Sequence, residues 1–252
     1  LALPEIKQDR LAYIAETLSA ASIDICVLPT EALELKAGYR INFLGSIPVF
    51  TIWQQPVRDV DGILKEIMDR GIALIAVFLL SPLLLLTALA IRLESKGPIL
   101  FRQKRFGFNN NEISVLKFRS MYVDRQDVSG AARTQKDDPR VTRVGRIIRR
   151  TSIDELPQLF NVLRGDMSLV GPRPHATMMR VGDKYYFDAV RGYTARHRVK
   201  PGITGLAQIR GLRGEIATTD RARKRVEYDI YYIENWSPLL DLRIMIETLF
   251  KL

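Results

Sequence analysis

The sequence predicts an α+β protein in which one apolar membrane segment precedes a mainly helical domain with short strands. Two observations carry this prediction. The 20 residues of 72–91 contain no charged side chain, which is long enough to cross a bilayer core of roughly 30 Å. Helical and strand patterns alternate before this segment, whereas helical patterns separated by Gly/Pro turns dominate after it. We therefore divide the chain into residues 1–60, 61–100 and 101–252.

Residues 1–60 are predicted to be the end of a larger α/β domain. The stretch DRLAYIAETLSAA has helical apolar spacing, and SIDICVLP and YRINFLGSIPVF are predicted strands bounded by proline and glycine. No G-x-G-x-x-G motif follows either strand, so no dinucleotide site is predicted. The chain begins with Leu1 and has no signal-peptide pattern. We expect the beginning of this domain to lie outside the sequence.

The apolar segment follows an amphipathic helix predicted over residues 61–70, and Ser81 and Pro82 lie at its middle. Pro82 has no N–H, so the carbonyl of Phe78 loses its helical partner, and the Ser81 hydroxyl is a suitable local donor. A break here would give two half-length helices that enter and leave by one face of the membrane. Physical reasoning alone leaves open a re-entrant helix-break-helix, a kinked crossing and a buried helix of a soluble protein.

Positive charge is concentrated directly after the apolar segment. The net charge is +10, and residues 101–150 hold 13 Lys and Arg against 5 Asp and Glu. A basic block beside an apolar segment indicates contact with anionic lipids or phosphate-bearing substrates and a cytoplasmic location for this side. Nucleic acid is the alternative from charge alone, but no nucleic-acid-binding module is recognisable. Cys26 is the only cysteine, which fits a reducing compartment.

The stretch RRTSIDELPQLFNVL carries the candidate chemistry. Asp154 and Glu155 are adjacent acids at the start of a helical pattern. Ser152 and Glu155 fit a capping box with Pro157 in the first turn, so acids that only cap a helix are one interpretation. The other is a phosphoryl-transfer site, in which arginines bind phosphate while carboxylates hold Mg²⁺ or attack phosphorus. The neighbouring basic residues are Arg143, Arg146, Arg149, Arg150, Arg173, Arg196, Arg198, Lys200, Arg210 and Arg213.

Five motifs together resemble a known family. In chain order they are LLSPLLLLTALAIRLESKGPILFRQKRFG, LKFRSM, RRTSIDELPQLFNVLRGDMSLVGPRP, KPGITGLAQ and YDIYYIENWS. From about Lys65 onward, the chain resembles the catalytic domain of the bacterial polyprenyl-phosphate hexose-1-phosphate transferases. These are monotopic phosphoglycosyl transferases that start exopolysaccharide, capsule and O-antigen synthesis. Residues 1–60 are similar to the end of the Rossmann-like domain of the larger members.

The resemblance implies roles for individual residues. Asp154 matches the nucleophile that attacks the β-phosphorus of a UDP-sugar, releases UMP and forms a phosphoglycosyl-aspartate, which undecaprenyl phosphate then attacks. Glu155 matches the second acid of the dyad, and either acid could bind Mg²⁺. Ser81 and Pro82 match the break of the family's re-entrant helix. The expected phosphate-binding set is Lys117, Arg119, Arg149, Arg173, Lys200 and Arg213.

The resemblance also implies substrates, location and partners. The motif GPRPHA resembles the glucose-1-phosphate branch; galactose-1-phosphate transfer and a non-catalytic membrane scaffold are the alternatives. The expected partners are a UDP-hexose, undecaprenyl phosphate and membrane lipids but no nucleic acid, and a homodimer is left open. The catalytic domain would lie on the cytoplasmic face of the bacterial inner membrane. Two departures from the family pattern are Leu206 in place of Trp and Arg210 in place of Asn or Ser.

Two smaller features complete the predictions. The last helix is expected to begin at Pro238 with Ser237 as its cap. Its wide apolar face fits either a core helix or a helix in the membrane interface with Trp236 at headgroup level, and we favour the interface. His175 and His197 have no Cys or His partner at ligand spacing, so a zinc site is not predicted. We expect His175 to shape the substrate pocket.

Overall fold

The computed structural model describes residues 25–27, 40–53, 59–125, 138–176, 179–190, 192–214 and 218–251. The first described strands, β1 (Ile25–Val27), β2 (Arg40–Leu44) and β3 (Ile47–Trp53), form an antiparallel sheet in the order β1-β3-β2. The strand predicted in SIDICVLP is confirmed. The stretch YRINFLGSIPVF is a hairpin rather than one strand, because the chain reverses at Gly45 with φ 66°. The helix predicted in DRLAYIAETLSAA lies outside the described residues.

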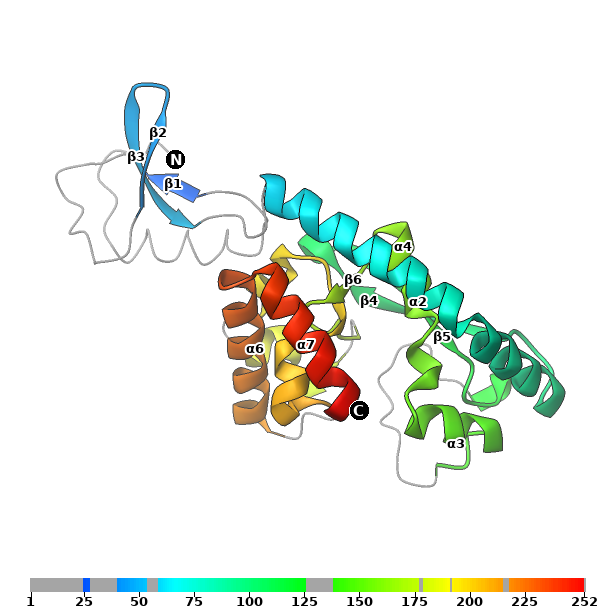
Figure 1. Ribbon diagram of the computed structural model, residues 1–252. Coiled ribbons are helices and arrows are strands. Elements are labelled where there is room, and N and C mark those ends of the chain that lie inside the picture. The colour runs from blue at the N-terminus through cyan, green and yellow to red at the C-terminus, as the bar shows by residue number, and fades with distance from the viewer. Residues whose placement is uncertain are drawn as a thin grey trace.

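Helix α2 (Asp59–Glu94) is a single element of 36 residues that contains both the predicted lead-in helix and the apolar segment (Figure 1). It is long and apolar enough to cross a membrane, and only 17% of its most apolar window is buried in the protein. The helix continues through Pro82, so the break predicted there is not an interruption of the helical backbone. The Ser81 hydroxyl donates to the Phe78 carbonyl at 2.8 Å, as predicted, and satisfies the acceptor that proline leaves free.

A basic hairpin follows α2. Strands β4 (Leu100–Phe106) and β5 (Glu112–Phe118) pair antiparallel from Leu100 opposite Phe118 to Phe106 opposite Glu112. The two strands are joined by a turn at 107–111 that contains η1 (Phe108–Asn110). The short turn η2 (Val123–Arg125) follows β5, and residues 126–137 lie outside the described ones.

Helix α3 (Arg143–Arg150) is fixed at its start by the end of α2. The Glu94 carboxylate accepts hydrogen bonds from the Arg143 and Val144 backbone N–H groups, the first at 2.6 Å. The Thr142 side chain accepts a third from Gly145. These bonds satisfy N–H groups that a helix leaves unpaired at its N-terminus. They therefore attach α3, and the turn that follows it, to the end of the apolar helix.

The remaining elements are short strands and helices, as the predicted α+β class requires. Strand β6 (Ser168–Val170) pairs parallel to β9 (Gly202–Thr204). Helices α6 (Thr219–Glu234) and α7 (Pro238–Lys251) pack beside each other (Figure 1), and the Ser237 hydroxyl caps α7 as predicted. The other elements are η3 (Ile153–Glu155), α4 (Gln158–Arg164), β7 (Arg180–Val181), β8 (Lys184–Tyr185), α5 (Tyr186–Ala189), η4 (Tyr193–Arg198) and η5 (Gln208–Leu212).

A buried polar cluster ties the first half of α2 to α7. The Lys65 ammonium lies 2.7 Å from an Asp241 carboxylate oxygen and 3.3 Å from Asp69. Asp241 also accepts from the Tyr232 hydroxyl at 2.7 Å and from the Trp236 indole at 3.0 Å. Trp236 therefore packs against the core with one side of its ring system, and its expected position at headgroup level stays a prediction. Because buried charges need such partners, this half of α2 is fixed to the protein.

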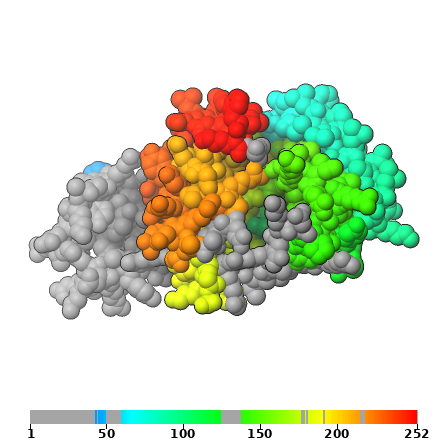
Figure 2. All heavy atoms as spheres, turned by 90° about the horizontal axis from the view of Figure 1, so that it is seen from below, coloured from blue at the N-terminus to red at the C-terminus, as the bar shows by residue number. Residues whose placement is uncertain are grey.

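Large apolar side chains remain exposed on α2 and α7. In Figure 2 the two helices lie along the same edge of the molecule. Phe78 and Leu85 of α2 are 77% and 71% exposed, and Phe250 of α7 is 84% exposed. An exposed apolar surface of this kind marks contact with a membrane or a protein. Other exposed members are Leu74, Ile75, Leu79, Leu86, Leu89, Leu93, Leu239, Leu242, Ile246 and Leu249.

Candidate active site

The two adjacent acids lie on the short 3₁₀ turn η3, between α3 and α4. The chain enters this turn through Ser152, which has a left-handed φ of 58°. Ile153 and Leu156 flank the acids and pack against an apolar cluster under the turn. The two acids thus lie on a rigid turn, as a preorganised site requires. The buried members of the cluster are Leu84, Ile91, Phe118 and Ile148.

The predicted capping box is wrong. Within the described chain, the Ser152 hydroxyl caps no helix and instead accepts a hydrogen bond from Arg213 at 2.7 Å. Helix α4 begins only at Gln158 with Pro157 as its N-cap, so neither acid lies in its first turn. The interpretation of the acids as helix caps therefore loses its geometric basis. Capping boxes depend on the backbone geometry at the first residue, and the left-handed Ser152 removes it.

Glu155 is held by two cations from different elements. The Lys117 ammonium of β5 lies 2.9 Å from Oε1. Arg173, in the loop after β6, donates from Nη1 to Oε2 at 3.1 Å and from Nη2 to Oε1. Burial alone would raise the pKa of Glu155, but Arg173 and Lys117 outweigh burial and hold that pKa below its usual range. Glu155 is therefore an ionised carboxylate with both oxygens engaged.

Asp154 contrasts with its neighbour. Its carboxylate accepts no hydrogen bond from any residue that the structure describes. Burial raises its pKa, and this effect is opposed by Lys117 and reinforced by the negative charge of Glu155. A carboxylate with unoccupied oxygens and a raised pKa is a better nucleophile or base than one fixed by cations. The geometry assigns different roles to the two acids.

Four cations surround the dyad and make it suitable for a phosphate-bearing substrate. Besides Lys117 and Arg173, Arg149 of α3 lowers the pKa of Asp154 by its charge. Arg105 of β4 is the fourth; burial and the neighbouring Arg173 lower its pKa to about 10, which leaves it charged. Arg105 was not among the residues predicted from the sequence. The strand register indicates its place in the site, because period-two alternation puts Arg105 and Lys117 on the same face of the hairpin.

Close backbone packing positions Arg173. Strand β6 continues into a loop that is joined to β9 by hydrogen bonds from the Gly171 N–H to the Thr204 carbonyl and from the Gly202 N–H to the Pro172 carbonyl. A Cβ at Gly202 would lie 2.1 Å from the Gly171 nitrogen, so only glycine permits this approach. The motifs VGPRP and KPGITG are therefore parts of one structural unit. They fix the backbone from which Arg173 reaches Glu155.

A fully buried ion pair lies behind Arg173. The Arg196 guanidinium donates to Asp229 Oδ2 at 2.7 and 3.0 Å and to the Arg173 carbonyl at 2.7 Å. It also contacts His175 Nδ1 at 2.7 Å. Burial and Arg196 lower the pKa of His175 well below its usual value, so the imidazole is neutral and accepts at Nδ1. His175 thus supports Arg196, whereas the sequence suggested a pocket-lining role.

Two members of the expected phosphate-binding set have contacts with α2 or the residues that follow it. Arg119 is 1% exposed and donates to the Ser95 and Lys96 carbonyls at 2.7 and 2.8 Å, beyond the end of the helix. The Lys200 ammonium binds Glu66 at 2.6 Å. Basic side chains often bind the carbonyls at the end of a helix, as Arg119 does. The structure therefore brings Lys117, Arg149, Arg173 and Arg213 to the catalytic turn and gives Arg119 and Lys200 structural contacts.

The two departures from the family pattern lie together on the α7 side. Leu206 is 5% exposed within the main core. Leu206 and Arg210 line one cavity of about 300 Å³. These residues therefore affect packing against α6 and α7. The other residues around this cavity are Ile209, Tyr228, Tyr231, Leu240, Arg243 and Ile244.

The donor set fits a magnesium ion held jointly with a substrate. The described residues contain no group of three or more His, Cys, Asp or Glu side chains that could hold a metal alone. Mg²⁺ is commonly bound by one or two carboxylates together with water and substrate phosphates. Asp154 has free oxygens for this purpose, whereas both oxygens of Glu155 already bind cations. Asp154 is thus the better candidate ligand.

Comparison with known proteins identifies the class of this chain as a sugar transferase. The model of the bacterial sugar transferase family matches residues 60–252, and this chain belongs to that family. The chain is 46% identical to "Undecaprenyl-phosphate glucose phosphotransferase" of Komagataeibacter xylinus over 98% of this chain and 46% of the relative. It is 52% identical to "Exopolysaccharide production protein PSS" of Rhizobium leguminosarum bv. phaseoli over 75% of this chain and 94% of the relative.

A third relative differs in the named sugar. It is "UDP-N-acetylgalactosamine-undecaprenyl-phosphate N-acetylgalactosaminephosphotransferase" of Aeromonas hydrophila, 46% identical over 74% of this chain and 43% of the relative. Relatives at this level of sequence identity are therefore named for more than one donor sugar. The chain spans about half the length of several relatives, at 46%, 51% and 45% of three of them.

Proposed function

We propose that this chain transfers glucose-1-phosphate from UDP-glucose to undecaprenyl phosphate and releases UMP. The observation that carries the proposal is the contrast within the dyad, where Asp154 is open and Glu155 is fixed by Arg173 and Lys117. Family membership and the names of the relatives support the same reaction. The product would begin an exopolysaccharide, as the name of the Rhizobium relative suggests.

The chemistry proceeds in two displacements at one phosphorus. An Asp154 oxygen attacks the β-phosphorus of UDP-glucose, the bond to the bridging oxygen breaks, and UMP leaves with the electron pair. A phosphate oxygen of the lipid then attacks the phosphoglycosyl-aspartate, and the Asp154 carboxylate departs. Lys117 and Arg173 stabilise the charge on the transferred group. Glu155 orients these cations, because a carboxyl with so low a pKa is a poor proton carrier at neutral pH.

Magnesium is proposed as the cofactor. When bound, it neutralises charge on the diphosphate and on the leaving UMP. Asp154 is the protein ligand with free oxygens. Arg105 and Arg149 add positive charge on the protein side, so the substrate is oriented by fixed groups as well.

The proposed location is the cytoplasmic face of the bacterial inner membrane. The exposed apolar side chains of α2 and α7 support contact with lipid on one face. We propose that α2 bends at Ser81 and Pro82 near the middle of the bilayer without losing its helical backbone, so that both ends of α2 stay on the cytoplasmic side. α7 would lie in the interface. Residues 1–60 are proposed to be the end of a Rossmann-like domain.

A UMP-release assay tests the proposal. The protein in detergent with Mg²⁺, UDP-glucose and undecaprenyl phosphate should release UMP, and Asp154→Asn should abolish the release. Asp188→Asn, at an exposed acid on α5, is the matched control and should keep full turnover. UDP-galactose and UDP-N-acetylgalactosamine test the donor. Absence of UMP with every donor would favour the non-catalytic scaffold instead.

A further inference from the structure

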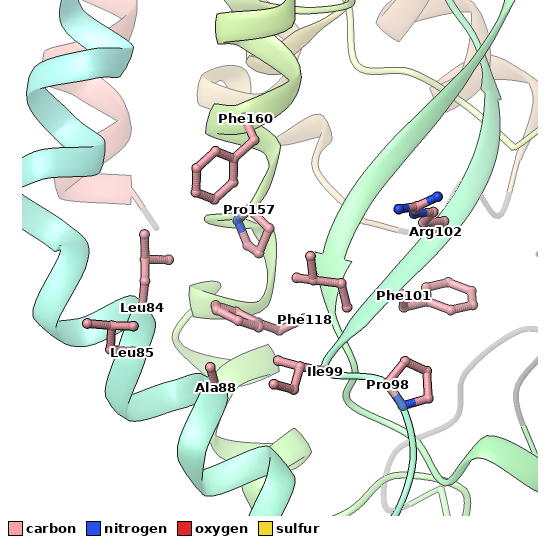
Figure 3. Close-up of a pocket in the computed structure, with 11 residues that line it drawn as sticks. Leu84, Leu85, Ala88, Pro98, Ile99, Phe101, Arg102, Phe118, Pro157 and Phe160 are labelled. Carbon is pink, nitrogen blue, oxygen red and sulfur yellow. The ribbon is translucent and has the colours of Figure 1, made fainter.

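We propose that an apolar groove between α2 and the β4–β5 hairpin holds the polyprenyl chain of the lipid acceptor, in the part nearest its phosphate. The inference rests on the proposed function, which supplies a polyprenyl phosphate as substrate. The groove is open and has a volume of about 810 Å³. Figure 3 shows Leu84, Leu85 and Ala88 on the α2 side, with Ile99 and Phe118 of the hairpin region facing them.

The lining chemistry fits a branched hydrocarbon. Apart from Arg102, every side chain that lines the groove is apolar. Phe118 and Phe160 provide aromatic surface, and Pro98 and Pro157 provide rigid surface without N–H donors. A carbohydrate or a nucleotide would leave its polar groups unpaired here. A chain of isoprene units gains from burial in proportion to its apolar area.

The groove lies close to the catalytic turn. Pro157 lines the groove and follows Glu155 by two residues. Phe118 lines it and follows Lys117, whose ammonium binds Glu155. The two residues of β5 face opposite sides of the strand, and β5 ends at Phe118. A polyprenyl chain in the groove can therefore pass around the end of β5 at Phe118 and present its phosphate to Asp154 and Glu155.

The groove also opens toward the apolar surface of α2. Leu84 and Leu85 follow Pro82 by two and three residues, whereas Pro98 and Arg102 lie beyond the end of the helix. Leu85 is 71% exposed, so it belongs both to the groove and to the surface proposed to contact lipid. Positive charge lies at the opposite end, on Arg102 and the cations of the dyad. This polarity matches an amphiphile with an anionic head and a long hydrocarbon tail.

A filled groove provides the test. Ala88→Trp should lower kcat/KM for undecaprenyl phosphate by about tenfold or more. The same variant should exchange labelled UMP into UDP-glucose at the wild-type rate, because this exchange needs no lipid. A two-unit prenyl phosphate should react equally well with the variant and the wild type, because it does not need the groove. Leu86→Trp is the matched control, at a 66% exposed residue on the same helix outside the groove. Phe160→Ala, at a 38% exposed position, is a second variant that should show the same selective loss.

Each other outcome has a defined meaning. An unchanged kcat/KM for undecaprenyl phosphate in both groove variants would overturn the proposal. Equal losses for long and short acceptors, or an equal loss in Leu86→Trp, would also overturn it by indicating general damage or altered membrane contact. Weaker binding to phospholipid vesicles without a change in kcat/KM would assign the groove to a membrane acyl chain. Failure of the wild type to exchange UMP would count against the proposed function instead.

Discussion

Arg173 donates to both carboxylate oxygens of Glu155, at 3.1 Å for the Nη1–Oε2 contact, and thereby distinguishes Glu155 from Asp154. A bidentate arginine fixes a carboxylate in orientation as well as in charge. The neighbouring Asp154 has no such partner among the described residues. One acid organises the cations and the other is left to react.

The first prediction concerns the cost of keeping Asp154 ionised. Burial raises its pKa above the unfolded value. The ionised group therefore destabilises the fold at neutral pH, and this penalty disappears below the unfolded pKa. Asp154→Asn should be inactive but more stable by about 1 kcal/mol, which raises Tm by roughly 2–4 °C. Differential scanning fluorimetry at pH 7 measures this, and a lower Tm would contradict it.

Glu155 should behave in the opposite way. Its lowered pKa means that it stabilises the fold above the unfolded pKa of about 4.3, and that this stabilisation is lost as pH falls further. Glu155→Gln leaves Arg173 and Lys117 partly buried without their counter-charge. We expect a loss of about 2 kcal/mol, below the range for a fully buried pair because the site is partly open. Urea unfolding measures it; a variant as stable as the wild type would refute the assignment.

The acid limb of the pH profile of kcat should depend on Arg149. The reactive form of Asp154 is the carboxylate, so activity falls as pH drops through its pKa. Arg149 lowers that pKa by its charge. Arg149→Gln should therefore move the acid limb of kcat to higher pH. The conservative Arg149→Lys should restore most of the original position, and a limb that stays in place in Arg149→Gln would contradict the electrostatic role.

Arg196 is predicted to position Arg173 from behind. Its guanidinium joins Asp229 to the Arg173 carbonyl. Arg196→Lys keeps the charge beside Asp229 but loses the planar set of donors. We expect kcat/KM for UDP-glucose to fall about tenfold, or about 1.4 kcal/mol. Arg198→Lys, also buried at 3% exposure, is the matched control, and equal losses in the two variants at equal Tm would argue against positioning.

Much of this arrangement was predictable from the sequence. The basic hairpin, its turn, the start of α7 and the hydrogen bond from Ser81 to Phe78 follow from local rules about proline, asparagine and caps. The adjacent acids were singled out by their arginine-rich surroundings. These features depend on residues close in sequence, so local sequence patterns and conformational preferences are enough to predict them.

The features that the sequence did not predict depend on distant contacts. The left-handed Ser152 is fixed by the packing of its turn, and its hydroxyl binds Arg213, 61 residues away. Arg119 resembles a phosphate ligand by its motif, yet it binds carbonyls after α2, which no local pattern indicates. Arg105 joins the site only through the register of two strands. α2 continues through Pro82 because the Ser81 hydroxyl satisfies the carbonyl that proline leaves free.

The most direct measurement is mass spectrometry of the intact protein after incubation with Mg²⁺ and UDP-glucose in the absence of lipid. The account predicts one added hexose phosphate, mapped by peptide analysis to Asp154 and removed when undecaprenyl phosphate is supplied. Asp154→Asn should carry no adduct, and Asp188→Asn should carry it in full. UMP release on addition of lipid without any adduct, or an adduct on Glu155, would contradict the central claim that Asp154 is the nucleophile.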